Sequence, residues 1–191
     1  GDRRRDRRPG DHGHDGLLRF AERRHTLVLG FGGAAGVVVD QRVELADHQL
    51  EFLLGDRRPQ SWNQWPEISW RDAKTPGHMG DLPHSWIGAE YMLSFRSLFA
   101  FEQEADQALI IAAGIAADWL SDGFEIRVKD LPTYYGKLSY TLRQDGANSL
   151  HLRISGDFSP ALRSIVVKPP LSHSLMQVEA NGNPVDSFDT G

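Results

Sequence analysis

The clearest pattern of apolar and polar positions lies in residues 86–106. Its apolar side chains recur at the spacing of one helical face, namely Ile87, Tyr91, Met92, Phe95, Leu98 and Phe99. Pro83 precedes the pattern, and Glu102, Glu104 and Asp106 close it with charge. The pattern therefore predicts a helix from Trp86 to Asp106. Because its apolar side chains cover more than one side, we expect it to pack against a second helix as well as the following sheet.

A second helical pattern occupies residues 41–55. Its apolar positions follow an approximate helical period and comprise Val43, Leu45, Leu50, Leu53 and Leu54. Gly55 is a plausible last residue, because glycine adopts the backbone conformation that commonly ends a helix. We expect residues 41–107 to form one helical region, in which the two helices are joined by a loop.

From Ala108 onward the apolar period changes from that of a helix to that of strands. Residues 108–115 form a short apolar run typical of a buried strand, and a helical turn is expected around Trp119-Leu120. Alternation in 138–142 and 150–154 flanks Asp145-Gly146, which is a hairpin signal. Further strands are expected in 124–132, 163–171 and 175–178. Residues 108–191 are therefore predicted to form an antiparallel β-sandwich that lacks its last edge strand, giving an α+β protein.

The first 40 residues lack a comparable pattern. Residues 1–16 hold five arginines and four aspartates but no large apolar side chain, so we expect them to be disordered. Residues 26–40 contain Gly30, Gly32 and Gly33 after an apolar run, which weakly suggests a dinucleotide-binding turn. Val37-Val38-Val39 favours a strand where that fold needs a helix. Residues 26–40 are therefore predicted to be hairpin-like or simply irregular, and residues 1–40 as a whole to be a disordered or irregular N-terminal segment.

Composition narrows the classes of function. The net charge of −5 gives no basic footprint, so nucleic acid is not an expected partner. No apolar run approaches the roughly 20 residues needed to span a bilayer, so no membrane is expected either. The chain has no cysteine, which removes thiolate metal sites and cysteine nucleophiles. Since the sequence also lacks a convincing phosphate-binding or nucleophilic-serine motif, no cofactor is predicted.

The most informative stretch for function runs from Ser61 to Tyr91, and most of it is predicted to be loop. It holds four of the five tryptophans, and prolines and glycines interrupt it repeatedly. A loop that carries large amphipathic rings tends to line a site. Aromatic faces can stack on the C–H faces of a pyranose, and amide or charged groups can bind its hydroxyls. We therefore expect a sugar-binding cleft whose substrate-binding residues are Trp62, Asn63, Gln64, Trp65, Trp70, Arg71, Asp72, Asp81 and Trp86.

The order of these parts is similar to a known enzyme family. Trp65-Pro66-Glu67 with Trp70, the helix start Pro83-His84-Ser85-Trp86, and the turn Tyr134-Tyr135-Gly136 follow one another before and within the predicted sandwich. This order resembles the C-terminal end of six-hairpin (α/α) glycosidases, in particular the α-L-rhamnosidase-like group. The resemblance covers about residues 41–180. It implies the terminal helices of an (α/α) six-hairpin barrel followed by a C-terminal β-sandwich.

The resemblance also implies an activity. The parent protein would be an inverting exo-glycosidase acting on a plant or microbial saccharide, with α-L-rhamnose as one candidate sugar. Glu67 would be the catalytic base, and His84 would contact the substrate or the catalytic carboxylate. No counterpart of the general acid occurs in residues 1–60, so this chain is expected to be a C-terminal fragment that is inactive alone and is completed by the rest of the parent barrel.

Other interpretations of the same residues stay open at this stage. Glu67 could fasten its loop near Arg71, and His84 could cap the helix that follows it. The tryptophans could be core residues at the junction of helices and sandwich. The spacing of His78, Asp81 and His84 could suggest a metal site, but it lacks the helical geometry of such motifs, so no metal is predicted. The alternative function is a non-catalytic carbohydrate-binding or accessory structural β-sandwich module.

Overall fold

The computed structural model describes the backbone of residues 18–20, 24–31, 48, 50–68, 80–171 and 174–188. Side chains are described from residue 48 onward within these ranges, except at position 122. Trp70, Arg71, Asp72 and His78 lie outside the described residues, as do residues 1–17 and 32–47.

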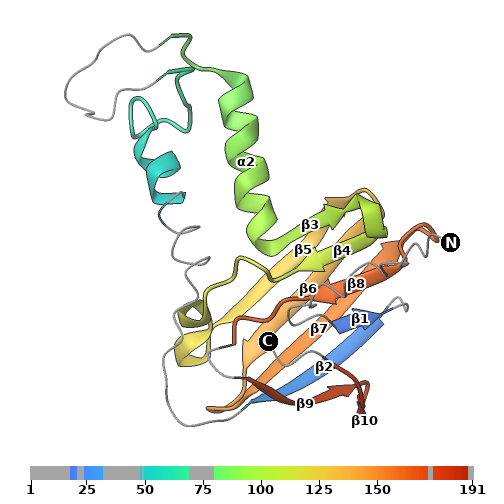
Figure 1. Ribbon diagram of the computed structural model, residues 1–191. Coiled ribbons are helices and arrows are strands. Elements are labelled where there is room, and N and C mark those ends of the chain that lie inside the picture. The colour runs from blue at the N-terminus through green and yellow to red at the C-terminus, as the bar shows by residue number, and fades with distance from the viewer. Residues whose placement is uncertain are drawn as a thin grey trace, which may run out of the picture.

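Helices and strands together give an α+β fold (Figure 1). One sheet has four strands in the order β1-β8-β4-β3, and the other has six in the order β10-β9-β2-β7-β6-β5. The elements are β1 (Leu18–Phe20), β2 (Arg24–Phe31), α2 (Ser85–Phe99), β3 (Ala100–Gln103), η1 (Glu104–Asp106), β4 (Ala108–Ile111), η2 (Ala117–Gly123), β5 (Glu125–Thr133), β6 (Gly136–Gln144), β7 (Ser149–Phe158), β8 (Ser164–Val167), β9 (Leu175–Ala180) and β10 (Asn183–Pro184).

The two sheets enclose one hydrophobic core, as the layers of a sandwich do. Leu109 and Ile111 of β4 point into it from the smaller sheet, and Leu142 and Leu152 meet them from the larger sheet. Alternate residues of the smaller sheet, such as Ile110, are buried on its other face. Burying alternate side chains removes apolar surface from water, which is the main favourable contribution to folding. The hairpin predicted at Asp145-Gly146 is confirmed, since β6 and β7 pair along their whole length.

The larger sheet departs from the sequence prediction at its centre. Residues 24–31, expected to be irregular, form β2, which pairs with β7 on one side and β9 on the other. Residues 18–20, also expected to be irregular, form β1 beside β8. The sheet is therefore completed by a strand from the N-terminal part of the chain. The smaller sheet is not purely antiparallel, because β4 and β8 run parallel.

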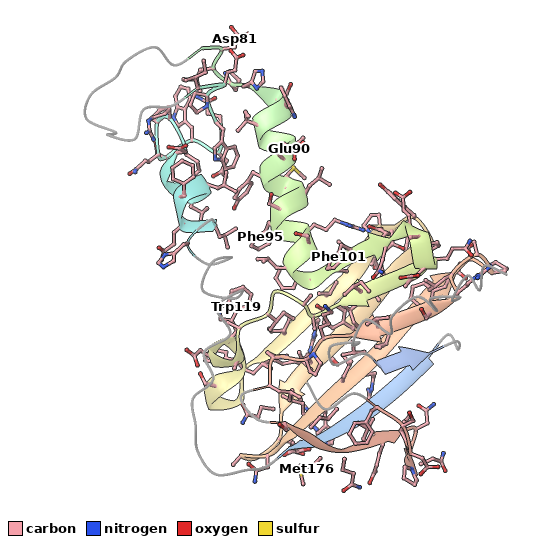
Figure 2. All side chains as sticks on the ribbon, in the orientation of Figure 1. Asp81, Glu90, Phe95, Phe101, Trp119 and Met176 are labelled. Carbon is pink, nitrogen blue, oxygen red and sulfur yellow. The ribbon has the colours of Figure 1, made fainter. Side chains whose placement is uncertain are left out.

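Residues 50–68 and 80–99 project from the two sheets, and we call this region the arm (Figure 1). Residues 50–55 are helical, as predicted, and lie beside α2. The prediction that the second helix continues to Asp106 is wrong, because α2 ends at Phe99 and Ala100 begins a strand. The chain turns there because β3 pairs with β4, a partner that helical periodicity does not reveal. Figure 2 shows Glu90 and Phe95 along the arm, well away from Met176 at the opposite end of the molecule.

No described residue of α2 is fully buried, so the expected packing of this helix on a second helix and on the sheet is found only in part, beside the segment 50–55 and at Phe99. Its apolar residues Trp86, Met92, Leu93 and Phe95 are exposed. The helix is nevertheless fastened at its C-terminal end, where the Tyr140 hydroxyl of β6 donates to the Phe99 carbonyl at 3.1 Å. Within the described residues, no helix has the length and apolar character needed to cross a membrane.

Candidate functional site

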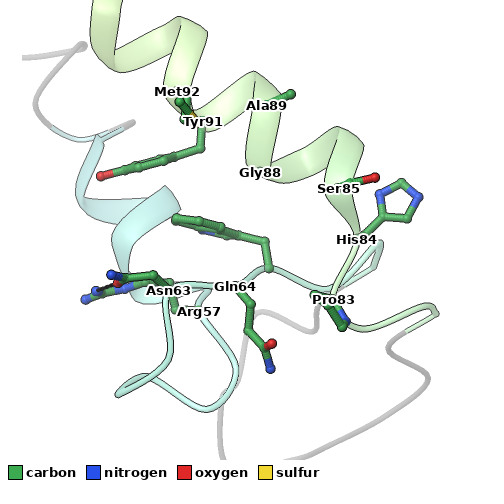
Figure 3. A pocket seen from close by; sticks show the side chains of 11 residues that line it. Arg57, Asn63, Gln64, Pro83, His84, Ser85, Gly88, Ala89, Tyr91 and Met92 are labelled. Carbon is green, nitrogen blue, oxygen red and sulfur yellow. Dashed lines mark hydrogen bonds between the residues drawn. The ribbon is translucent and has the colours of Figure 1, made fainter.

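A cavity of about 550 Å³ lies in the arm, between α2 and the loop that precedes it (Figure 3). We call it the arm cavity. Its volume lies within the range of about 300–1,000 Å³ that is usual for small-molecule sites. The lining residues come from the loop, the start of α2 and its first turns, and they are Arg57, Asn63, Gln64, Trp65, Pro83, His84, Ser85, Gly88, Ala89, Tyr91 and Met92.

Trp65 joins the parts of the arm that surround the cavity. Only 7% of its surface is exposed, and its indole N–H donates to the Leu53 carbonyl at 2.7 Å. Its ring stacks on Tyr91 of α2, with 4.3 Å between centroids and 27° between planes. The Trp65 carbonyl also accepts a hydrogen bond from the His84 backbone N–H. Trp65 is therefore a packing residue of the arm and a wall of the cavity at once.

The polar wall of the cavity is held by hydrogen bonds within the loop. Arg57 donates from Nε to the Leu54 carbonyl at 2.9 Å, where the helical segment 50–55 ends, and from a terminal nitrogen to Asn63 Oδ1 at 3.1 Å. Gln64 donates to the Arg58 carbonyl at 2.8 Å. These bonds fix the guanidinium and the two amides at the cavity rim. Each group keeps further hydrogen-bonding capacity for a ligand.

His84 lies at the other end of the drawn cavity from the Tyr91 ring (Figure 3). It occupies the position just before α2, but its side chain makes no capping hydrogen bond. Its Nδ1 atom is buried and has no hydrogen-bond partner among the described residues. An unpaired buried polar atom costs free energy, so this nitrogen is a candidate for pairing when the cavity is occupied.

Glu67, the predicted catalytic base, does not line the arm cavity. It is exposed, its backbone N–H donates to the Asp81 carbonyl at 2.9 Å, and its carboxylate accepts the Asp81 N–H at 3.4 Å. A Cβ at Gly80 would lie 2.6 Å from the same carboxylate, so only glycine permits this close approach. The observed contacts of Glu67 therefore fasten the loop, and Glu67 and His84 do not share the cavity.

The other predicted site residues divide into three groups. Asn63, Gln64 and Trp65 line the cavity together with His84. Trp62 and Trp86 do not line the cavity, and their exposed fractions are 60% and 66%. The Trp86 indole N–H donates to the Glu90 carboxylate. Asp81 is also exposed outside the lining. Trp70, Arg71 and Asp72 lie outside the described residues, so the structure does not place them.

Sequence reasoning missed Arg57 and Tyr91 as members of the site. Arg57 precedes the aromatic loop, and Tyr91 was assigned to the apolar stripe of the helix. The position of Tyr91 in the sequence could have indicated its role. It follows the helix start at Pro83 by only about two helical turns, so it lies near the loop that enters the helix. Among the described residues, Glu102 and Tyr140 have shifted pKa values, and both lie at the base of the arm. Within the described part of the chain, no three His, Asp or Glu side chains gather as metal ligands.

The arrangement can therefore bind a small polar molecule between an aromatic wall and a rim of donors and acceptors. Comparison of the sequence and the fold with known proteins gives no match to a protein family, a curated protein or a solved structure.

Proposed function

We propose that this chain binds a saccharide in the arm cavity and does not hydrolyse it alone. The observation that carries the proposal is the pairing of Trp65 and Tyr91 beside the amides of Asn63 and Gln64. Aromatic rings supply apolar surface to the C–H faces of a sugar, and amides and a guanidinium supply donors and acceptors for its hydroxyls. A volume of about 550 Å³ is sufficient for a small ligand of this kind.

Binding without cleavage follows from the residues of the cavity. Glycoside hydrolysis normally needs two carboxyl groups on either side of the bond, about 5–9.5 Å apart depending on the mechanism. The described lining contains no Asp or Glu, and the nearest sequence candidate, Glu67, is bonded to the Asp81 backbone. This favours a carbohydrate-binding module over a complete hydrolytic site.

A second candidate function is favoured by the exposed apolar side chains of α2. Trp86, Met92, Leu93 and Phe95 are all exposed, and they lie on more than one side of this helix. Apolar side chains on several sides of one helix favour its packing against further helices. In this candidate function the arm belongs to the helical barrel of a six-hairpin glycosidase-like protein, whose other helices cover these side chains and supply the catalytic acid. The arm cavity would then form one part of that protein's sugar site.

Calorimetric titration with neutral monosaccharides, including L-rhamnose, tests the first proposal. We expect saturable binding that Tyr91→Leu weakens about fivefold to tenfold, because an aromatic contact contributes about 1 kcal/mol beyond its area. Trp62→Leu is the matched control, since Trp62 is exposed outside the lining. Thermal unfolding of both variants checks that the arm stays folded. Absence of binding to every sugar, or equal weakening by the control, would contradict the proposal.

A further inference from the structure

The outer face of the larger sheet carries a second group of polar side chains, far in sequence from the arm cavity. Two adjoining hollows of about 220 and 160 Å³ lie there across β5, β6 and β7, and both include Thr141 and Arg153. Their lining contains four permanently charged cations, Arg127, Lys129, Arg143 and Arg153, and one carboxylate, Glu125. We call this surface the arginine face.

Strand register brings three arginines together around one threonine. Thr141 on β6 pairs with Arg127 of β5 on one side and with Arg153 of β7 on the other. Arg143 is two residues further along β6 and pairs with His151, which makes it a diagonal neighbour of Arg153. Diagonal neighbours of this kind are about 7–8 Å apart, and strands two apart are separated by about 10 Å. The three guanidinium groups therefore belong to one compact area of the sheet.

Three of these cations have no side-chain partner among the described residues. Arg127 is bonded to Glu125 at 2.7 Å, and His151 lies 3.2 Å from the Asp145 carboxylate. The side chains of Lys129, Arg143 and Arg153, in contrast, are exposed and form no hydrogen bond or ion pair with any other described residue. Their donors are therefore available to an external acceptor. A concentration of positive charge is notable in a chain whose net charge is −5.

We propose that the arginine face binds an acidic polysaccharide through its carboxylate or sulfate groups. Guanidinium groups bind planar or tetrahedral anions through paired, charge-assisted hydrogen bonds. The Thr141 and Ser155 side chains on the same face supply hydroxyls for sugar hydroxyls. Single-stranded nucleic acid is less well matched, because such sites stack bases on exposed aromatic rings. The two linings contain no Trp or Phe, and the ring of Tyr140, their one Tyr, is buried. The saccharide nature of the partner rests on the proposed function, whereas its charge follows from this face alone.

The test uses the whole chain and a short oligogalacturonate, with its methyl-esterified form as the uncharged counterpart. We expect the acidic oligomer to bind at about 50 mM salt and to lose most of its affinity at about 200 mM, because exposed charges are screened. The esterified oligomer should bind at least tenfold more weakly. The double variant Arg143→Gln with Arg153→Gln should lower the affinity for the acidic oligomer by tenfold or more, since each charge-assisted bond contributes substantially.

Arg163→Gln is the matched control, because Arg163 is exposed but lies outside both hollows. It should leave the affinity within about twofold, and both variants should keep the thermal stability of the parent chain. Failure of the acidic oligomer to bind, or equal binding by the double variant, would overturn the inference. An oligothymidylate that binds as tightly as the oligogalacturonate would overturn the saccharide assignment. Neutral-sugar binding that depends on Tyr91 is unaffected by any of these outcomes, so the two proposals fail separately.

Discussion

The ion pair between Arg96 and Glu102 connects the arm to the sheets, and its removal gives a prediction that can be worked out in detail. Arg96 belongs to the last turn of α2, and Glu102 lies on β3. Two guanidinium nitrogens donate to the two carboxylate oxygens at 2.9 and 2.6 Å. The carboxylate also accepts the Tyr134 N–H at 3.1 Å, and Arg96 donates to the Pro132 carbonyl at 2.9 Å. One pair thus joins the helix, β3 and the β5–β6 turn.

The size of the expected loss of stability follows from the burial of the two side chains. The Glu102 side chain is only 7% exposed and that of Arg96 is 22% exposed, so Arg96→Met leaves a carboxylate in a poorly hydrated place. Removing one partner of a buried pair costs about 3–5 kcal/mol, and we expect the lower end here because Arg96 itself reaches solvent. The matched control is Arg127→Met. Its side chain is 71% exposed in the pair with Glu125, so the expected loss is about 0–1 kcal/mol.

The pH dependence of the free energy of unfolding gives an independent check on the role of this ion pair. Burial alone would raise the pKa of Glu102, but the hydrogen bonds from Arg96 and the Tyr134 N–H, with the Arg96 charge, together hold it below its ordinary value of 4.5. A lowered pKa in the folded state means that the pair contributes its stability above that ordinary value and loses it as the pH falls. In Arg96→Met the difference from the parent chain should therefore shrink as Glu102 becomes protonated.

Urea unfolding at pH 7 and at about pH 3 measures both effects. The expected result is a loss of about 3 kcal/mol at pH 7 that becomes clearly smaller in acid. The double variant Arg96→Met with Glu102→Met should be closer to the parent chain than the single variant, because no unpaired charge remains. A loss at pH 7 no larger than that of the Arg127→Met control would refute the reasoning, as would a loss that does not depend on pH.

Three further predictions concern single groups. Tyr140→Phe removes the hydrogen bond to the Phe99 carbonyl and should lower the free energy of unfolding by about 1 kcal/mol in urea. Burial raises the pKa of Tyr140, so the parent chain should lose stability as the pH rises above the ordinary pKa value of 10.0. Thermal unfolding at alkaline pH should show that Tyr140→Phe loses less stability with rising pH than the parent chain does. Gly136→Ala should cost about 2 kcal/mol or more in urea unfolding, because φ is +123° and a Cβ would lie 2.1 Å from the Asp157 carbonyl oxygen; no destabilisation would contradict this. Glu67→Gln should leave sugar affinity in calorimetry within about twofold, and a larger loss would return Glu67 to the site.

Local pattern was sufficient for much of the fold. The strands of residues 124–158 could be predicted because their apolar and polar positions alternate, and Asp145-Gly146 marks the turn between two of them. The helical stripe from Ile87 to Phe99 was equally visible. In both cases the pattern reflects contacts between residues close in sequence, or the two-residue period of a half-buried strand.

The pairing of strands that are distant in the sequence could not be predicted from local pattern. β2 became the central strand of the larger sheet because β7 and β9, more than a hundred residues later, supply its hydrogen bonds. Such pairings depend on register between distant segments, which the local sequence of either segment does not specify. The helix ended at Phe99, earlier than expected, for a more local reason, since β3 pairs with β4, which follows it after four residues.

The prediction of a sugar site stays a prediction, and the structure shows only which of its residues share a cavity. Trp65, Asn63, Gln64 and His84 line the arm cavity. Glu67 lies only two residues after Trp65, but backbone bonds to Asp81 turn its carboxylate elsewhere. In an irregular loop no fixed period relates neighbouring side chains to one face, so spacing could not separate Glu67 from its neighbours.

The most direct test of sugar binding in the arm cavity is to follow the tryptophan indole N–H signals by nuclear magnetic resonance during a sugar titration. Trp65 forms the cavity wall, whereas Trp119 packs near Phe99 at the base of the arm and serves as an internal control. The account predicts a saturable shift of the Trp65 signal, with an unchanged Trp119 signal and with loss of the shift in Tyr91→Leu. A Trp65 signal that stays unmoved at saturating sugar, or moves equally in Tyr91→Leu, would contradict it.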